Sequence, residues 1–195
     1  MPQEHVESFA GSSGSGKSTD ILELVAAATA APSSQIDLAC QAASLVCLGN
    51  TFIEAYSHNE PDLILVDEEG DDQLRRWHVV RDRYRLNIYL HQVLKADSAR
   101  GLHDHPWASH SIILKGVLRE VLESGERILY PGSITARSAE ELHRLEVVEG
   151  PVWTLFITGP KVRDWGFMMP DGTWRHSETM VKIEGKRAYT LPMDI

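Results

Sequence analysis

The sequence has few basic residues and no long apolar run. Its 19 Lys and Arg residues are outnumbered by 28 Asp and Glu residues, which gives a formal net charge of -9 over 195 residues. An acidic surface repels phosphate backbones, so this charge disfavours non-specific binding to nucleic acid. No apolar stretch approaches the roughly 20 residues of a membrane-spanning helix. We therefore expect neither nucleic acid nor a membrane as a partner.

Cysteine is scarce too, with only Cys40 and Cys47 in the chain. Seven residues apart in a helical pattern, they would share a face but lie too far apart for a disulfide. So few cysteines favour a reducing compartment. Residues 1–16 lack the basic and apolar regions of a signal peptide. We expect a cytoplasmic protein.

Residues 1–60 differ from the rest of the chain in composition and in hydrophobic pattern. Residues 1–19 are polar and rich in Gly and Ser, which favours a flexible tail. Residues 20–31 and 34–48 have helical patterns, and Gly49-Asn50 is a helix-ending pair. These features predict an N-terminal extension made of a tail and two helices.

From Pro61 onward, short β-type runs alternate with turn residues. Many short strands at close and regular spacing indicate an all-β sandwich or barrel. We therefore predict an all-β domain over residues 61–195. The predicted strands span residues 63–66, 77–80, 86–94, 111–114, 117–122, 128–130, 133–136, 143–148 and 152–158. An arginine-rich stretch in this region is expected to lie on the solvent face of a strand, and its members are Arg75, Arg76, Arg81, Arg83 and Arg85.

Two histidines, His103 and His105, are separated by one residue. Alternate residues of a strand point to the same side of the sheet, which inside a narrow barrel is the lumen. Imidazoles that are neutral near pH 7 bind divalent ions such as Fe, Mn, Ni, Cu or Zn. A third ligand has to come from another strand to close a facial arrangement.

At these residues the chain resembles the cupin family. Cupin motif 1 has the form G-x5-H-x-H-x3,4-E-x6-G, and motif 2 has the form G-x5-P-x-G-x2-H-x3-N. His103, His105 and His143 occupy the three histidine positions, and Gly116 and Gly132 match the glycines that flank the short segment between the motifs. The departures from the two motifs are Asp97, Ser109 in place of the glutamate, Ser138, Glu140 and Val147.

The cupin resemblance implies a double-stranded β-helix, or jelly-roll, barrel from about residue 74 to 168. It also implies a divalent metal on His103, His105 and His143. Thiol dioxygenases of the cysteine dioxygenase type are cupins with a three-His iron, and this chain is similar to them locally, around the three histidines and in the stretch ILKGVLRE. That similarity favours Fe(II), with Mn, Ni and Zn as alternatives, and a dioxygenase, an oxidoreductase, acting on a small polar substrate. In that family the residue at the glutamate position is sometimes a Cys that is crosslinked to a Tyr. This crosslink cannot form here because Ser109 stands at that position.

The region from Arg76 to Phe167 also looks like small cupin-domain proteins of bacteria and phages. Features such as LHDHPW and WTLFITGP carry this likeness. It supports the predicted fold and metal site, but it implies no substrate.

Other residues are candidates for the walls of a site. Tyr89 and His91 share one strand face and are candidate catalytic residues at the mouth of the barrel. Trp153, Leu155 and Ile157 share the face of another strand, and each of the five residues is more often part of a core than in contact with a ligand.

Three polar residues lie near the motifs. Arg163 is the third catalytic candidate, because a guanidinium can bind a substrate carboxylate through two nitrogens. An ion pair with Asp164 or a surface glutamate is an equally good interpretation of Arg163. Strand alternation places His110 outward if Ser109 faces inward, and it turns Asp104 away from the lumen.

Residues 11–18 match the P-loop pattern G-x4-G-K-[ST] through Gly11, Gly16, Lys17 and Ser18. In a P-loop, Lys17 would reach the phosphates and Ser18 would hold Mg²⁺, with Asp67 as a second Mg²⁺ partner.

Three observations weigh against this nucleotide site. The preceding segment contains Glu7 and Ser8, where a buried parallel strand needs apolar residues. About 70 residues precede the barrel, too few for a complete P-loop sheet. A Gly/Ser-rich tail also produces the pattern by chance. Nucleotide binding is the lesser alternative.

The sequence thus favours a metal-dependent enzyme without settling its class. A non-enzymatic cupin that binds a metal or small ligand as a sensor or accessory protein is the main alternative. An isomerase or epimerase, with a His or Tyr acid/base, is a further one. We expect a small molecule as the partner, and a homodimer is an open option.

Overall fold

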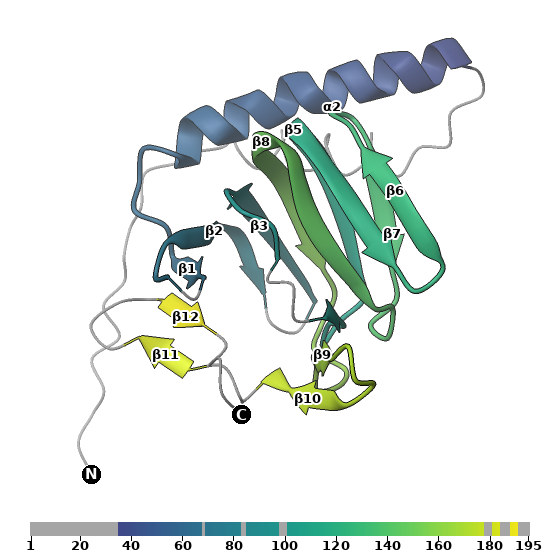
Figure 1. Ribbon diagram of the computed structural model, residues 1–195. Helices are drawn as coiled ribbons and strands as arrows, with labels where there is room; N and C mark the ends of the chain where they lie inside the picture. Colours follow the sequence, from purple (N-terminus) through teal and green to yellow (C-terminus); the bar gives the residue numbers. More distant parts are fainter. Residues whose placement is uncertain are drawn as a thin grey trace.

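The computed structural model describes residues 35–67, 69–82, 85–97, 101–177, 181–183 and 188–190. In this part of the chain, one long helix, α2 (Gln35–Tyr56), is followed by a curled 12-stranded sheet (Figure 1). The strands are β1 (Leu63–Val66), β2 (Asp72–Asp82), β3 (Leu86–Val93), β4 (Leu102–His103), β5 (Ser109–Leu122), β6 (Gly125–Leu129), β7 (Ile134–Arg137), β8 (His143–Thr158), β9 (Gly166–Met168), β10 (Trp174–His176), β11 (Val181–Ile183) and β12 (Ala188–Thr190). The all-β prediction is confirmed. The predicted tail and the predicted helix at 20–31 lie outside the described residues.

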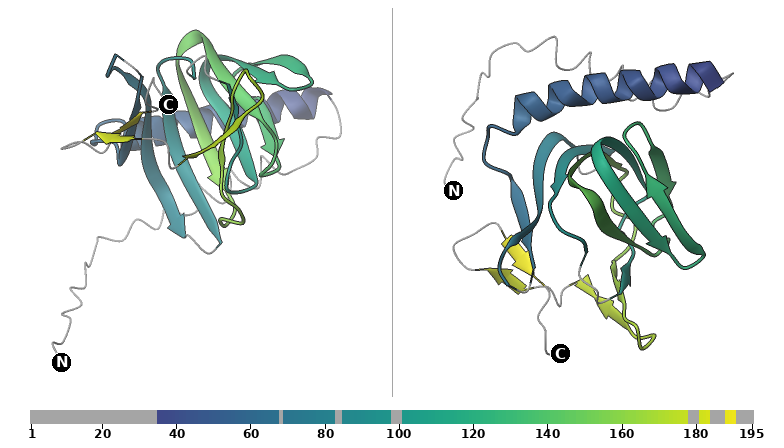
Figure 2. Two further views of the ribbon diagram at one scale, coloured as in Figure 1. Left: turned by 60° about the horizontal axis from the view of Figure 1, so that its bottom comes forward. Right: turned by 45° about the horizontal axis from the view of Figure 1, so that its top comes forward.

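Two long strands pair along their whole length at the centre of the curled sheet. β5 pairs with β8 from Ser109 opposite Thr158 to Leu122 opposite His143. The main strand order is β10-β9-β4-β8-β3-β2-β1-β12-β11, and β5 also pairs with β6 and β7. All of these pairs are antiparallel except β1 with β12. The second view of Figure 2 shows the curled sheet below helix α2.

The strands β5 and β8 were each expected as two shorter strands, and this expectation is wrong. Gly116 lies inside β5, where the register with β8 shifts between Ile113 and Leu118. It has a φ of 78°, and a Cβ added there would lie 2.6 Å from the carbonyl oxygen of Glu149. Glycine at this position therefore allows a bulge that bends the paired strands without ending them.

Helix α2 is longer than expected because it does not end at Gly49. A Cβ added to Gly49 would lie 2.2 Å from Cδ2 of Leu114 on β5. Glycine here lets the helix approach the sheet closely and does not cap the helix. Leu45 and Phe52 on the same side of the helix are buried against the sheet. Packing of this face outweighs the low helix propensity of glycine.

The sheet face toward α2 carries one apolar cluster. Trp77 and Trp153 stack in it, with ring centroids 5.6 Å apart, and Leu45 of the helix is completely buried. Burying a side chain of that size contributes roughly 1.5–3 kcal/mol. Leu155 and Ile157 also belong to this cluster. The expectation that these two residues and Trp153 belong to the core is confirmed.

The opposite, inner face of the sheet is formed by the alternate residues of the same strands. On β8 these are Thr154 and Phe156, and on β3 they include His91. A second apolar cluster continues this face and contains Val93, Ile113, Leu118, Leu129 and Val152. The inner face therefore combines an apolar wall with a few polar side chains.

The cysteines of α2, Cys40 and Cys47, are both free thiols and both exposed. No helix in the described part of the chain is long and apolar enough to cross a membrane.

Candidate metal centre

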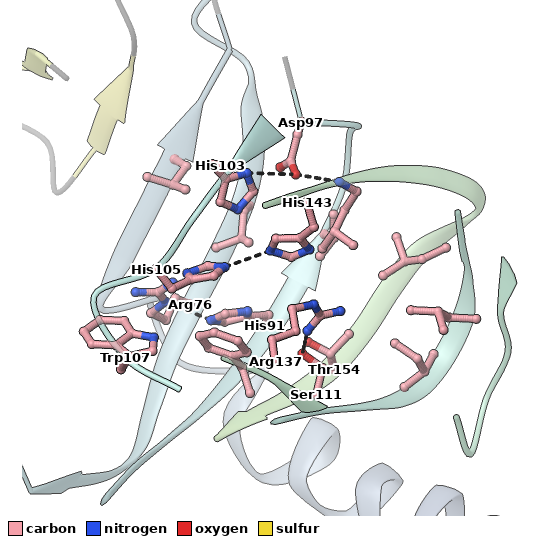
Figure 3. A pocket seen from close by; sticks show the side chains of 18 of the residues that line it. Arg76, His91, Asp97, His103, His105, Trp107, Ser111, Arg137, His143 and Thr154 are labelled. Atoms are coloured by element: carbon pink, nitrogen blue, oxygen red, sulfur yellow. Dashed lines mark hydrogen bonds and ion pairs between the residues drawn. The ribbon is translucent and has the colours of Figure 1, made fainter. Parts of the chain in front are cut away.

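Three histidines meet on the inner face of the sheet (Figure 3). His103 on β4 lies directly opposite His143 on β8, and His105 follows just after β4. One ring nitrogen from each residue lies within 4.8 Å of the others. The Nε2 atoms of His105 and His143 are 2.8 Å apart. Two nitrogens bound to one ion at about 2.1 Å and a right angle would be about 3 Å apart. The cluster therefore could bind a divalent metal.

The backbone around His105 is held by the loop before β8 and by the first residue of β9. Its N–H donates to the carbonyl of Ala139 at 3.1 Å. The N–H of Asp104 donates to the carbonyl of Gly166 at 3.1 Å. Residues close in sequence to β8 and β9 thus set the position of His105 relative to His143.

All three imidazoles are held in the neutral form. Burial lowers the pKa of His143 to about 3, against a raising effect of its hydrogen bond with Glu120. Burial also holds the pKa of His105 well below its usual value, and the neighbouring His103 and His143 lower it further. The pKa of His103 is lowered by burial, with Asp97 opposing. Neutral imidazole is the form that binds metal ions.

Two carboxylates lie behind two of the histidines. Oε1 of Glu120 is 2.9 Å from Nδ1 of His143, which is hydrogen-bonding distance. Oδ2 of Asp97 is 3.8 Å from Nδ1 of His103, too long for a direct hydrogen bond, and it accepts the N–H of Leu145 at 2.7 Å. Both histidines therefore direct Nδ1 toward an acid, which leaves Nε2 for the inner face.

Ser109 stands at the glutamate position of the first motif and provides no acidic group. It is completely buried, and its Oγ has no hydrogen-bond partner in the described part of the chain. His110, the next residue, is exposed, as strand alternation predicts. Within the described ranges, the side chains close enough to share one ion are three histidines and no acid.

A cavity of about 170 Å³ opens beside the three histidines. Its volume lies below the roughly 300–1,000 Å³ of pockets for drug-sized ligands, which indicates a small ligand. The aliphatic wall includes Leu118, Leu129 and Leu145. The other labelled lining residues in Figure 3 are Arg76, His91, Asp97, Trp107, Ser111, Arg137 and Thr154.

Arg76 is a cation on the inner face, which corrects the expectation of a solvent-facing arginine. Its Nε donates to Nε2 of His91 at 2.8 Å, and its guanidinium carbon lies 4.8 Å from the centroid of the Tyr89 ring. Burial lowers its pKa, yet an arginine stays protonated. Within the described ranges it makes no ion pair with a carboxylate. Arg75, its neighbour, pairs with Asp72 as a surface arginine does.

The three candidate catalytic residues have different positions. His91 lines the cavity, and burial followed by the charge of Arg76 holds its pKa well below the usual value. Tyr89 is buried, stacks on His91 with centroids 6.0 Å apart and does not line the cavity. Arg163 does not line it either, and donates to Oδ2 of Asp104 at 2.6 Å.

Asp104 has a structural role, as its predicted orientation suggests. It is buried, and its second oxygen accepts the N–H of Gly166 at 2.7 Å. With Arg163 on its first oxygen, this carboxylate ties the segment between the two histidines to the loop before β9. Arg163 therefore has an ion-pair partner, although the partner is Asp104 and not Asp164.

Sequence reasoning missed Glu120 and Arg137. Glu120 is completely buried on β5, and it accepts hydrogen bonds from the Nε atoms of Arg137 and Arg127, both at 2.6 Å. Arg137 lines the cavity. The detectable signal was alternation, since Leu118 and Glu120 share the inner face of β5. A charged residue at a position where an apolar one is expected marks a buried polar network.

The nucleotide-binding candidates Gly11, Gly16, Lys17 and Ser18 lie outside the described residues. Asp67, their expected partner, pairs with Lys95 and accepts the N–H of Asp71 at 2.8 Å.

Comparison with solved structures identifies the fold. No protein-family model and no curated protein matches the sequence. The DMSP lyase DddQ from Ruegeria pomeroyi is 17% identical over 65% of this chain and 70% of its own, with a TM-score of 0.52. KdgF from a Halomonas species is 16% identical over 46% of this chain and 82% of its own, with a TM-score of 0.41.

A cupin-like protein from Thermotoga maritima is 16% identical over 49% of this chain and 76% of its own, with a TM-score of 0.40. The curled antiparallel sheet and the similarity to the lyase structure agree with the fold that the two histidine motifs predict. The chain therefore has the cupin fold, with a three-His cluster on the inner face of its sheet and helix α2 on the outer face.

Proposed function

We propose that His103, His105 and His143 hold one divalent metal, with Fe(II) favoured, and that the protein is a dioxygenase-like enzyme acting on a small polar substrate. The observation that carries this proposal is the convergence of three neutral imidazoles, of which that of His143 is buried and the other two are partly buried, from β4, the turn after it and β8. Three neutral nitrogens fit an iron, manganese, nickel or zinc ion. When bound, Fe(II) would supply the redox chemistry of a dioxygenase.

The protein's own contribution is a dry, fixed site. The lining beside the histidines is mainly aliphatic and aromatic, with Phe156 and Trp165 near His105. Such a lining excludes bulk water and strengthens the electrostatic interactions inside the cavity. Three monodentate ligands also leave coordination positions for other molecules. Both features suit an enzyme that brings a small substrate to the ion.

Two unmatched donors on the wall indicate the character of the substrate. Arg76 has no carboxylate partner in the described ranges, and the buried Nε1 of Trp107 has no hydrogen-bond partner there. A partly buried cation without a counter-charge and a buried N–H without an acceptor are costly unless something satisfies them. We propose that a carboxylate or similar anionic group of the substrate binds Arg76. Arg163 is not proposed for this role because Asp104 occupies it.

A non-enzymatic cupin that binds the metal or a small ligand is the second candidate. This candidate is supported by the small number of acid/base groups in the cavity that are free to act as a catalyst. Asp97 is the one carboxylate among the described residues that line it, and Asp97 accepts the N–H of Leu145. His91 accepts a hydrogen bond from Arg76. An isomerase that needs such a group as its catalyst is favoured less.

Oxygen consumption separates the two candidates. The protein would be loaded anaerobically with Fe(II) and screened with small thiols and carboxylic acids, each beside the amide of the same acid. We expect oxygen uptake with at least one carboxylate, little with its amide, and none with the zinc-loaded protein. Stoichiometric iron without oxygen uptake on any compound would contradict the enzyme and favour the ligand-binding protein.

A further inference from the structure

Glu120 connects the three-His cluster to a buried ionic network. Its side chain is completely buried, and Oε1 lies 2.9 Å from Nδ1 of His143. The same oxygen accepts from Arg137, whose side chain is 2% exposed, and Oε2 accepts from Arg127, which is 42% exposed. The network thus runs from a partly exposed arginine on β6 through a fully buried carboxylate to one of the three histidines.

The hydrogen bond between Glu120 and His143 determines where the imidazole carries its proton. A carboxylate that pairs with two guanidinium groups is an acceptor only. Nδ1 of His143 therefore has to be the donor, so a neutral His143 has its lone pair on Nε2. That atom faces Nε2 of His105 at 2.8 Å, on the side where the ligand atoms of the cluster converge.

Glu120 has other partners besides His143. The two arginines already give Glu120 three donors, namely Nε of Arg127 and two guanidinium nitrogens of Arg137. The remaining interaction is directed at His143. At the other carboxylate, Asp97, the distance to His103 is 3.8 Å, so within the described ranges Glu120 is the acid that makes a direct hydrogen bond to the cluster.

We propose that Glu120 is a positioning residue that fixes the tautomer and the ring orientation of His143, so that Nε2 is presented to a divalent metal. This inference rests on the proposed metal site. Ser109 removes the acidic ligand from the first motif, and Glu120 places a negative charge one hydrogen bond further from the ion. Loss of such an outer partner lowers metal affinity by about 10- to 100-fold.

Glu120→Gln is the variant that tests this proposal. Glutamine has the same shape and still accepts from an arginine, but its amide can turn either a carbonyl or an NH₂ group toward Nδ1. The matched control is Glu126→Gln on β6, whose side chain is 62% exposed. A second control, Arg127→Gln, removes one partner of Glu120 and leaves the bond to His143.

Two measurements are made on full-length protein with ¹⁵N-labelled histidine. Long-range ¹H–¹⁵N NMR of the metal-free protein reports which nitrogen of His143 carries the proton, and competition with a chelator gives the affinity for Zn(II). We expect Nδ1–H in the wild type and in both controls. In Glu120→Gln we expect a population with the proton on Nε2 and a Zn(II) affinity about 10- to 100-fold weaker.

Two results would overturn the inference. One is a proton on Nε2 of His143 in the metal-free wild type, which needs no variant and so holds even if Glu120→Gln fails to fold. The other is a Glu120→Gln protein with unchanged tautomer and unchanged Zn(II) affinity. Failure of the wild type to bind Zn(II) or Fe(II) would instead sink the proposed function, while the tautomer of His143 would still decide the role of Glu120.

Discussion

The Nε2 atoms of His105 and His143 face each other at 2.8 Å. At this distance one nitrogen has to donate a hydrogen bond to the other, since two bare lone pairs would repel. His143 already donates Nδ1–H to Glu120, so His105 is the donor in the metal-free protein. A metal shared by both residues needs both Nε2 lone pairs.

Metal binding should therefore change the tautomer of His105. Its proton should move from Nε2 to Nδ1 when Zn(II) is added, while His143 keeps its proton on Nδ1. Long-range ¹H–¹⁵N NMR on the labelled protein, before and after one equivalent of Zn(II), gives the measurement. The exposed His110 is the internal control, because its spectrum should stay the same. Unchanged signals from His105 at saturation would argue against coordination through Nε2.

Arg76→Met should weaken the binding of a carboxylate ligand and change the stability of the fold only slightly. A methionine of similar length keeps the packing against Tyr89 but removes an unneutralised, desolvated charge. We expect the free energy of unfolding in urea to fall by no more than about 1 kcal/mol, the value of one hydrogen bond to His91. Binding of the best carboxylate of the oxygen-consumption panel should weaken at least tenfold.

The control for Arg76 is Arg75→Met, which changes an exposed arginine next to it in the sequence. This variant should bind the carboxylate as the wild type does. A loss of about 3–5 kcal/mol in Arg76→Met would indicate a broken buried ion pair and a purely structural arginine.

Gly49→Val should destabilise the packing of α2 on β5. The new Cβ would overlap Leu114, and overpacking of this kind costs typically 1–3 kcal/mol. Ala43→Val on the exposed face of the same helix is the control, and its propensity cost stays below about 0.7 kcal/mol. Chemical denaturation of both variants measures the difference. Equal stabilities would mean that Gly49 does not approach the sheet closely.

Asp104→Asn should loosen the segment that carries His105. The amide would replace a buried acceptor of two hydrogen bonds, from Arg163 and from the N–H of Gly166. We expect a loss of about 1–3 kcal/mol in unfolding free energy and a weaker affinity for Zn(II). Asp164→Asn, at a side chain that is 65% exposed, should change neither quantity. A stable Asp104→Asn protein with normal Zn(II) affinity would show that Asp104 does not hold His105 in position.

The sequence predicts the parts of the molecule that depend on local patterns. Strand alternation predicts that His103 and His105 point to one side, the resemblance to the second cupin motif adds His143, and the structure brings the three together. Strand alternation also predicts the exposed His110 correctly. The pairing of β4 with β8, which puts His143 opposite His103, is long-range and comes from the structure.

Features that depend on long-range packing were predicted less well. Glycine is typical of helix ends and turns, so the sequence places an end or a break at Gly49 and at Gly116. In the structure each glycine instead allows a close approach to another element, at Leu114 and at Glu149 respectively. The inward orientation of Arg76 and the pairing of Arg163 with Asp104 depend on contacts between distant residues. Glu120 was detectable only as a charge in an apolar alternation, and its partner Arg137 lies 17 residues away.

The metal content of the purified protein tests the central claim most directly. The wild type, purified without a metal-affinity tag, would be compared by elemental analysis with His103→Ala and His143→Ala. We expect about one iron, manganese, nickel or zinc per chain in the wild type and a loss in both variants. No stoichiometric metal in the wild type, even after anaerobic loading with Fe(II), would contradict the three-His metal site.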